Sequence, residues 1–192
     1  MILEGIVTTR NGQGELNIAP MGPVVNSEMS QLVLRPFQTS RTFSNLKETR
    51  CGVFHVVDDV LLLTKAAIGL LEEIPETFPA EQISGAVLQS ACRWYEFQIE
   101  SIDETAERTV MQAKVIHHGR IRDYFGLNRA KHAVLEAAIL ATRTHLIEQS
   151  EMQAQYRPLA EIVKKTAGPE EQTAFDLLEE YISKAYARAR PI

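Results

Sequence analysis

The sequence changes character near residue 120. Before that point, short runs rich in Val, Ile and Thr alternate with Gly, Pro and Asn, whereas residues 128–147 are rich in Ala, Leu and Glu and contain neither Gly nor Pro. Short β-branched runs predict strands, and a long apolar stripe at helical spacing predicts a helix. We therefore expect a β domain over residues 1–122, followed by a helical segment over residues 123–192 that packs on the barrel or on a partner copy.

The β part predicts six strands in a barrel or sandwich. Residues 2–9 and 16–25 form the first hairpin, because Asn11-Gly12 and Gly14 supply the positive φ values of a tight turn. Pro20 and Pro23 lie in the returning strand, which must therefore be an edge strand or be broken by a bulge. The other strands are expected at residues 31–37, 52–57, 91–102 and 109–118. Two short helices lie between them, the first capped by Ser40 or Thr42 and the second by Asp58 or Asp59.

A long helix is expected over residues 128–147, with shorter ones over residues 158–166 and 169–187. At helical spacing, its small and apolar residues cover one broad face and a narrow polar stripe lies opposite. The stripe consists of Arg129, His132, Glu136 and Arg143. Two interpretations remain open: an ordinary solvent-exposed face with helical ion pairing, or side chains that reach a subunit interface or a ligand phosphate.

Charge and cysteine content narrow the class of protein. The 192 residues carry 20 Lys and Arg against 25 Asp and Glu, a net charge of -5, which argues against a nucleic-acid or membrane-surface partner. Cys51 and Cys92 are too few for a disulfide framework and lack the spacing of a structural zinc site. The first residues do not have the pattern of a signal peptide, and no apolar stretch has transmembrane length. We expect a cytoplasmic protein.

The most informative segment is Met29–Lys47, which contains Arg35, Arg41 and Lys47 but neither Asp nor Glu. It also provides hydroxyl and amide donors at the start of the first short helix. Positive charge, hydrogen-bond donors and a helix N-terminus together suit a phosphate group. Composition alone leaves this open, because Ser and Thr are equally typical of an ordinary helix cap in a solvated loop.

A second segment without acidic residues is 108–122, which includes His117 and His118. Neighbouring strand residues point to opposite faces, so these two cannot ligate one metal, and no metal is expected. Two interpretations of these histidines remain open: one of them faces an anionic ligand, or both lie on a plain surface strand. The sequence contains no Gly-rich phosphate loop and no nucleophile elbow, so it assigns no catalytic residue and gives little support to a hydrolase with a covalent nucleophile.

Three longer motifs resemble a known family. The runs EGIVTTRNGQGELNIAPMGPVV, LVLRPFQTSRTFSNLKETRCGVFHVVDDVLLLTKAA and FGLNRAKHAVLEAAILATRTHL are similar to an uncharacterised family of FMN-binding split-barrel proteins. That family is related in fold to the flavin reductases and the pyridoxamine phosphate oxidases and has a helical segment after the barrel. The resemblance covers about residues 1–147.

The resemblance implies a fold that is mainly β plus α: a six-stranded split β-barrel of Greek-key type, followed by a C-terminal helical segment. It implies that FMN is held without a covalent link at a homodimer interface. It implies that the flavin ring is lined by Asn17, Ile18, Ala19, Pro20 and Met21. It implies that the phosphate and ribityl chain are held by Arg35, Thr39, Ser40, Thr42 and Asn45. The freed backbone of a proline-broken strand would suit the polar edge of the ring.

The function implied is an FMN-dependent oxidoreductase of flavin reductase type, with NAD(P)H or a small molecule as electron donor. A non-catalytic FMN carrier or sensor remains an alternative. So does a module for another phosphorylated cofactor, such as a pterin or pyridoxal phosphate, because an anion pocket does not identify the ring beyond it. Arg129 or Arg143 is hypothesised to reach the flavin site or the partner subunit.

Overall fold

The computed structural model describes residues 1–106 and 108–189, which form two compact units. One unit contains Met1–Val57 and Ile74–Tyr124, and the other contains Asp58–Glu73 and the chain from Phe125 onward. Within the described residues, no helix is both long and apolar enough to span a membrane.

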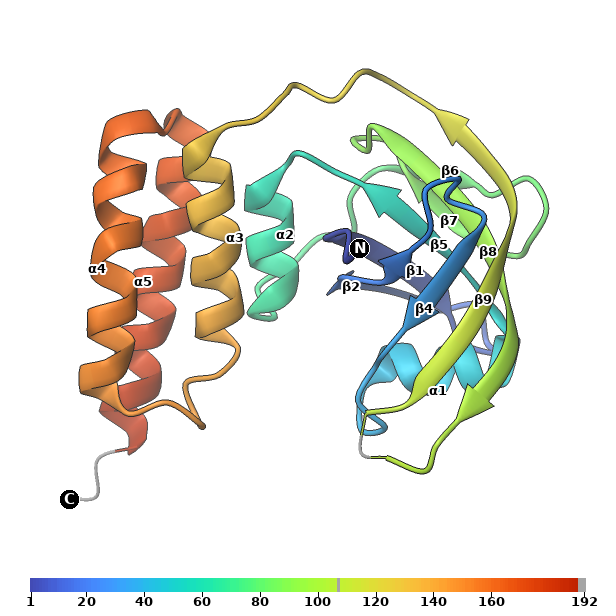
Figure 1. Ribbon diagram of the computed structural model, residues 1–192, viewed down its shortest axis with the longest axis horizontal. Coiled ribbons are helices and arrows are strands. Elements are labelled where there is room, and N and C mark those ends of the chain that lie inside the picture. Colours follow the sequence, from blue (N-terminus) through green and yellow to red (C-terminus); the bar gives the residue numbers. More distant parts are fainter. Residues whose placement is uncertain (107, 190–192) are drawn as a thin grey trace. The chain divides into compact units, whose positions relative to one another are not determined.

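The first unit is a curled antiparallel sheet of seven strands in the order β2-β1-β5-β8-β9-β4-β3 (Figure 1). A bridge between Ile2 and Val24 joins β3 to the segment before β1, so the curled sheet closes on itself. The strands are β1 Gly5–Arg10, β2 Leu16–Met21, β3 Val24–Val25, β4 Gln31–Leu34, β5 Cys51–Val56, β8 Arg93–Asp103 and β9 Val110–Arg120. The predicted split-barrel fold class is confirmed, with seven strands in this sheet instead of six.

The first hairpin forms as predicted, between β1 and β2. The Asn11 side chain organises its turn, because its Oδ1 accepts the N–H groups of Gln13 (3.1 Å) and Glu15 (2.8 Å). Gly14 has a φ of 85°, whereas Gly12 does not adopt a positive φ, so that part of the expectation is wrong. The Asn11 side chain supplies the turn geometry that a second left-handed glycine would otherwise provide.

The returning strand is an edge strand and is also broken, as its prolines predict. It divides into β2 and β3 at Gly22 and Pro23, and β2 pairs only with β1 in the sheet order. Every residue of β2 is partly exposed. The break therefore leaves one side of β2 without a strand partner.

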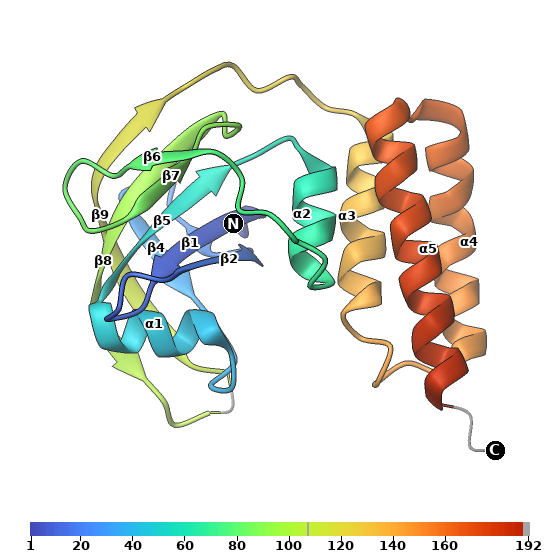
Figure 2. The ribbon, with the colours of Figure 1, turned by 180° about the vertical axis from the view of Figure 1, so that it is seen from behind.

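Two further strands, which are absent from the six predicted, cover one face of the sheet. They form the hairpin β6 Thr77–Pro79 and β7 Ala86–Leu88. The Thr8 hydroxyl donates to the Ala86 carbonyl at 2.6 Å, and the Leu88 N–H donates to His55 Nε2 at 3.1 Å. The opposite face carries the main core cluster, to which α1 Arg41–Thr49 contributes Phe43 and Leu46. Figure 2 shows α1 at one end of the barrel.

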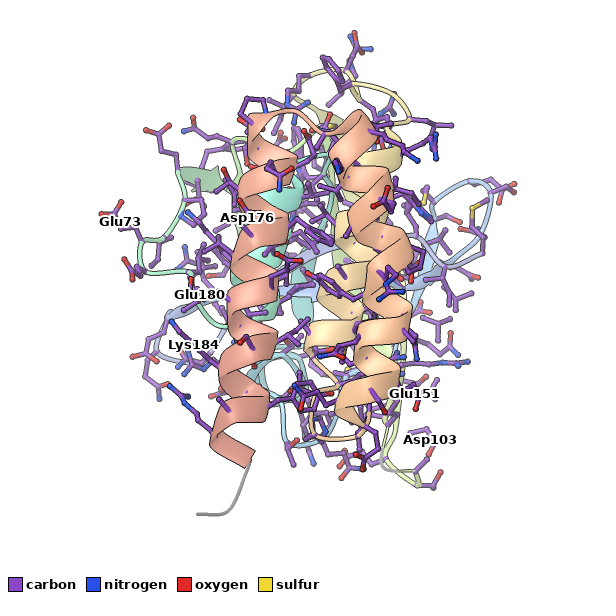
Figure 3. The ribbon with its side chains drawn as sticks, turned by 90° about the vertical axis from the view of Figure 1, so that its left-hand side faces the viewer. Glu73, Asp103, Glu151, Asp176, Glu180 and Lys184 are labelled. Atoms are coloured by element: carbon purple, nitrogen blue, oxygen red, sulfur yellow. The ribbon has the colours of Figure 1, made fainter. Side chains whose placement is uncertain are left out.

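The second unit is a bundle of four helices, α2 Val60–Ala67, α3 Arg129–Ala141, α4 Gln149–Thr166 and α5 Pro169–Ala189. Asp59 caps α2, and Asn128 caps α3. Helix α2 lies in the segment assigned to the barrel domain from sequence, yet it packs with α3 and α5. Figure 3 labels Glu151 on α4 and Asp176, Glu180 and Lys184 on α5, all of which are exposed.

Candidate functional site

The N-terminus of α1 is the centre of the predicted anion site. Ser40 is its cap: its Oγ accepts the N–H of Phe43 at 3.1 Å and donates to the carbonyl of Phe37 at 2.7 Å. The next two residues, Arg41 and Thr42, occupy the first turn, where backbone N–H groups have no partner within a helix. The first turn contains no acidic side chain that would compete for these groups.

A buried polar cluster fastens this helix to β1 and β2. The Asn17 side-chain amide on β2 donates to the Thr42 hydroxyl at 3.0 Å and lies 3.4 Å from the Thr9 hydroxyl. From α1, the Asn45 amide donates to the same Thr9 hydroxyl at 3.0 Å. Thr9, Thr42 and Asn45 are each at most 4% exposed. The cluster therefore brings together three of the predicted site residues, Asn17, Thr42 and Asn45.

Thr9 is the member of this cluster that is not among the predicted site residues. A threonine in a strand is ordinary, and its role becomes visible only through its partners on two other elements. The only available signal was its position eight residues before Asn17 in a predicted hairpin, which places the two opposite each other.

Several cationic side chains belong to α1 or to the segments beside it. Arg35 follows β4 and is exposed, as are Thr39 and Arg41. The guanidinium of Arg108 lies 4.4 Å from the centre of the Phe37 ring, just before the cap residue. Lys47, in contrast, forms a salt bridge with Glu104 at 2.8 Å near the other end of the helix. Arg41 therefore lies in the first turn of α1, Arg108 contacts the segment that leads to it, and Arg35 lies five residues before the cap.

The edge strand β2 offers backbone groups beside this corner. Pro20 lies opposite Ile6 of β1 and has no N–H to donate, which fits a position whose backbone groups point away from β1. Antiparallel pairing alternates along the strand, so Ile18 has the same orientation. The N–H and C=O of Ile18 and the C=O of Pro20 thus point to the open side of β2.

The histidines of the barrel have structural surroundings. His55 is fully buried, and its pKa is lowered to about 4 by desolvation, although the bond between its Nδ1 and the Ile6 carbonyl (3.1 Å) acts in the opposite direction. His117 lies 3.3 Å from Glu81, whereas the His118 ring lies 5.9 Å from that of Tyr95 on the other face. The two adjacent histidines diverge as expected, and the described residues contain no cluster of three or more metal-ligating side chains.

A cavity of about 320 Å³ lies elsewhere in the barrel unit. It is lined by the end of α1, the start of β5, β8 and the loop between β6 and β7, with Thr49, Arg50 and Cys51 on one side. None of the residues predicted to contact a flavin lines it. The predicted site is an open corner formed by β2 and α1, and this cavity is separate from it.

Comparison with known families identifies the chain. The model described as "Protein of unknown function (DUF447) N-terminal domain" matches residues 3–122, and that described as "Protein of unknown function (DUF447)" matches residues 128–180. The chain belongs to the DUF447 family. No curated protein sequence matches it significantly.

Solved structures agree with this DUF447 assignment. The FMN-bound DUF447 protein MM1853 from Methanosarcina mazei is 26% identical, with a TM-score of 0.80 over 94% of both chains. The flavin reductase HpaC, complexed with NADP+, is 16% identical, with a TM-score of 0.54 over 65% of this chain and 83% of its own. The styrene monooxygenase flavin reductase from Pseudomonas putida S12 is 14% identical, with the same TM-score over 63% and 82%. The last two likenesses cover the share of the chain expected for the barrel and indicate its fold.

Proposed function

We propose that this DUF447 protein binds FMN without a covalent link and acts as a flavin-dependent oxidoreductase of flavin reductase type. The observation that carries the proposal is the tie between Asn17 on β2 and Thr42 on α1, because it joins a helix N-terminus to an open strand edge. An FMN-bound relative that matches 94% of the chain supports the same cofactor.

The chemistry of this corner fits the two polar ends of FMN. The phosphate needs positive charge and N–H donors, which Arg35, Arg41 and the first turn of α1 supply. The polar edge of the flavin ring needs both donors and acceptors, which the outward backbone groups of Ile18 and Pro20 supply. Thr39, Ser40 and Asn45 complete the predicted phosphate and ribityl contacts, although the Ser40 hydroxyl also caps the helix. Ala19 and Met21 add apolar surface beside the ring.

Bound FMN would supply the electron transfer, and the protein supplies binding and orientation. The predicted contact residues include no carboxylate and no histidine, and the buried His55 is held neutral by desolvation. Hydride transfer to a flavin needs no protein acid, so this composition is compatible with the reaction. The same feature favours the second candidate, a non-catalytic FMN carrier.

Absorption and turnover measurements test these proposals. We expect the purified chain, after reconstitution with FMN and removal of free cofactor, to keep a flavin spectrum with one FMN per chain. A spectrum without flavin bands, or with those of pyridoxal phosphate, would refute FMN binding. Oxidation of NADH or NADPH well above the rate with free FMN supports the oxidoreductase, whereas rates equal to free FMN support the carrier.

We also propose a homodimer in which a second copy covers the flavin ring. Two observations support it: β2 is partly exposed along its whole length, and in the helical unit Phe125 and Leu127 are 84% and 101% exposed. Sedimentation of the FMN-loaded chain is expected to give twice the mass of one chain, and a monomer would refute the dimer. The hypothesis for Arg129 and Arg143 is tested in parallel, because alanine variants that leave both FMN affinity and dimer mass unchanged would exclude it.

A further inference from the structure

The end of the β8–β9 hairpin away from its tip carries two arginines in direct opposition. Arg93 opens β8 and pairs with Arg120, the last residue of β9. Residues directly opposite in an antiparallel pair share a face, and like charges there are destabilising. Both side chains are exposed. This arrangement breaks a rule of sheet composition, and such departures cluster at functional positions.

The arginine pair lies on the face of the sheet that carries the main core. Alternation places Arg93 on the same face as Tyr95 and Phe97, which belong to the core cluster. On β9, His118 has the same orientation, as its ring contact with Tyr95 shows. The opposite face holds Trp94 against the β6–β7 hairpin. The two arginines thus lie on the core-facing side of β8 and β9, at the end of the hairpin away from its tip.

Protection of a free strand edge does not explain the pair. Beyond Val115, β9 pairs only with β8, and a charged residue there discourages edge-to-edge association. One charge on β9 suffices for that purpose, whereas Arg93 lies on β8, which is paired on both sides. Asp123 forms an ion pair with Arg120 at 3.1 Å, but both side chains are more than half exposed, so the pair is weak. No ion pair of Arg93 is found within the described residues.

The pair is too far from α1 to contact the phosphate expected there. Pro20, Ile6, His55, Trp94 and Gly119 form one row across five strands. Pro20, in this row, is three residues along β2 from Asn17, and Arg93 and Arg120 lie one residue beyond the row. The two arginines are therefore four residues further along the strands than Asn17. At about 3.3 Å per residue this offset is about 13 Å. The two arginines also lie three and four strands from β2 in the sheet order, so they are separate from the phosphate position expected at the start of α1.

We propose that Arg93 and Arg120 bind a phosphate group of a pyridine dinucleotide that donates electrons to the flavin. This inference rests on the proposed function, and it assigns to this chain's own residues the recognition of the second substrate. A guanidinium pair suits a phosphate because each presents a planar fork of N–H donors. Binding also removes the cross-strand repulsion, so the anion stabilises the hairpin end that holds it.

The test measures binding of oxidised NADP+ to the FMN-loaded chain by calorimetry. We expect Arg93→Gln together with Arg120→Gln to raise the Kd of NADP+ about tenfold or more. Lys114→Gln is the matched control, because it removes one positive charge from an exposed position on the same strand and should change the Kd less than about twofold. An unchanged Kd in the double variant would overturn the proposal.

Three further titrations identify the phosphate and separate this proposal from the preceding one. If NAD+ binding weakens as much as NADP+ binding, the pair holds the pyrophosphate; if only NADP+ and adenosine 2′,5′-bisphosphate weaken, it holds the 2′-phosphate. Inorganic phosphate that binds as tightly as NADP+ would refute a dinucleotide site. The double variant should bind FMN as the unchanged chain does. Failure of the unchanged chain to bind FMN would refute the proposed function, whereas normal FMN binding by both chains with unchanged dinucleotide affinity in the double variant refutes only the subsite.

Discussion

Replacing Arg35 by alanine tests the proposed phosphate site most directly. A hydrogen bond to a charged group contributes about 1.5–3 kcal/mol. Arg35 is exposed in the free chain, so its guanidinium must be ordered when the phosphate binds, and the lower end of that range applies. We therefore expect Arg35→Ala to weaken FMN binding by about 1.5 kcal/mol, or about tenfold in Kd.

The assay is a titration of the FMN-free chain into FMN, in which binding is measured by the quenching of flavin fluorescence. Arg35→Lys should fall between the alanine variant and the unchanged chain, because it keeps the charge and loses the planar fork of donors. Arg157→Ala, at an exposed position on α4, removes the same charge from the helical unit and serves as the control. Equal Kd values for Arg35→Ala and Arg157→Ala would show that the phosphate binds elsewhere.

Three further predictions concern the site and the interior of the barrel unit. Thr42→Val removes the acceptor of the Asn17 amide at 3.0 Å and should weaken FMN binding less than Arg35→Ala does, by titration. Glu96→Gln should lower the free energy of unfolding, measured by denaturant titration, by about 2–3 kcal/mol. The reason is that this fully buried carboxylate accepts the N–H groups of Glu81 and Gln82 at 2.8 and 2.7 Å. Glu81→Gln, at an exposed position, is the control and should change the free energy of unfolding little. His55 is buried and neutral, with its pKa lowered from 6.5 to about 4, so at pH 5 the unfolded chain binds a proton at this residue that the folded chain does not. The chain should therefore be about 2 kcal/mol less stable at pH 5 than at pH 7. The variant His55→Gln should lose this pH dependence of stability.

Local signals in the sequence predicted the elements that local interactions determine. Ser40 caps α1 and Asp59 caps α2, and each is one of the two cap residues predicted for its helix. The turn at Asn11 joins the two strands of the first hairpin. Pro20 and Pro23 correctly predict an interrupted edge strand, because proline removes a ladder donor wherever it occurs.

Elements without a local signal were missed or misplaced. The β6–β7 hairpin has strands of three residues, bounded by Pro75 and Gly85, which are too short to show alternation. Helix α4 begins at Gln149 without a side-chain cap and continues through Pro158, where the sequence predicts the helix to start. Helix α2 gave a correct helical prediction, but its partners lie about 70 residues or more further along the chain, and periodicity carries no information about them.

The candidate site shows the same division. The residue types at the start of α1 indicate an anion site. For Asn17, the local sequence predicts a position on the second strand of the first hairpin and nothing about its partners. That Asn17 meets Thr42 depends on how α1 crosses the sheet, which no spacing encodes. The hydroxyl of Thr9, the shared partner of Asn17 and Asn45, was missed for the same reason.

The contacts between β2 and α1 are polar, although apolar contacts would exclude water equally well, and the need to fix the register of β2 explains this. A slip of β2 by one residue would move every side chain to the opposite face, and an edge strand has a ladder on one side alone to oppose the slip. Asn17 can reach Thr42 in only one register, and its amide would otherwise lose that acceptor. Fixing Asn17 inward fixes Ile18 and Pro20 with their backbone groups outward. The same hydrogen bonds that hold α1 to the sheet therefore also set the distance between the N-terminus of α1 and the open edge of β2, which suits the proposed ligand, with a phosphate at one end and a polar ring at the other.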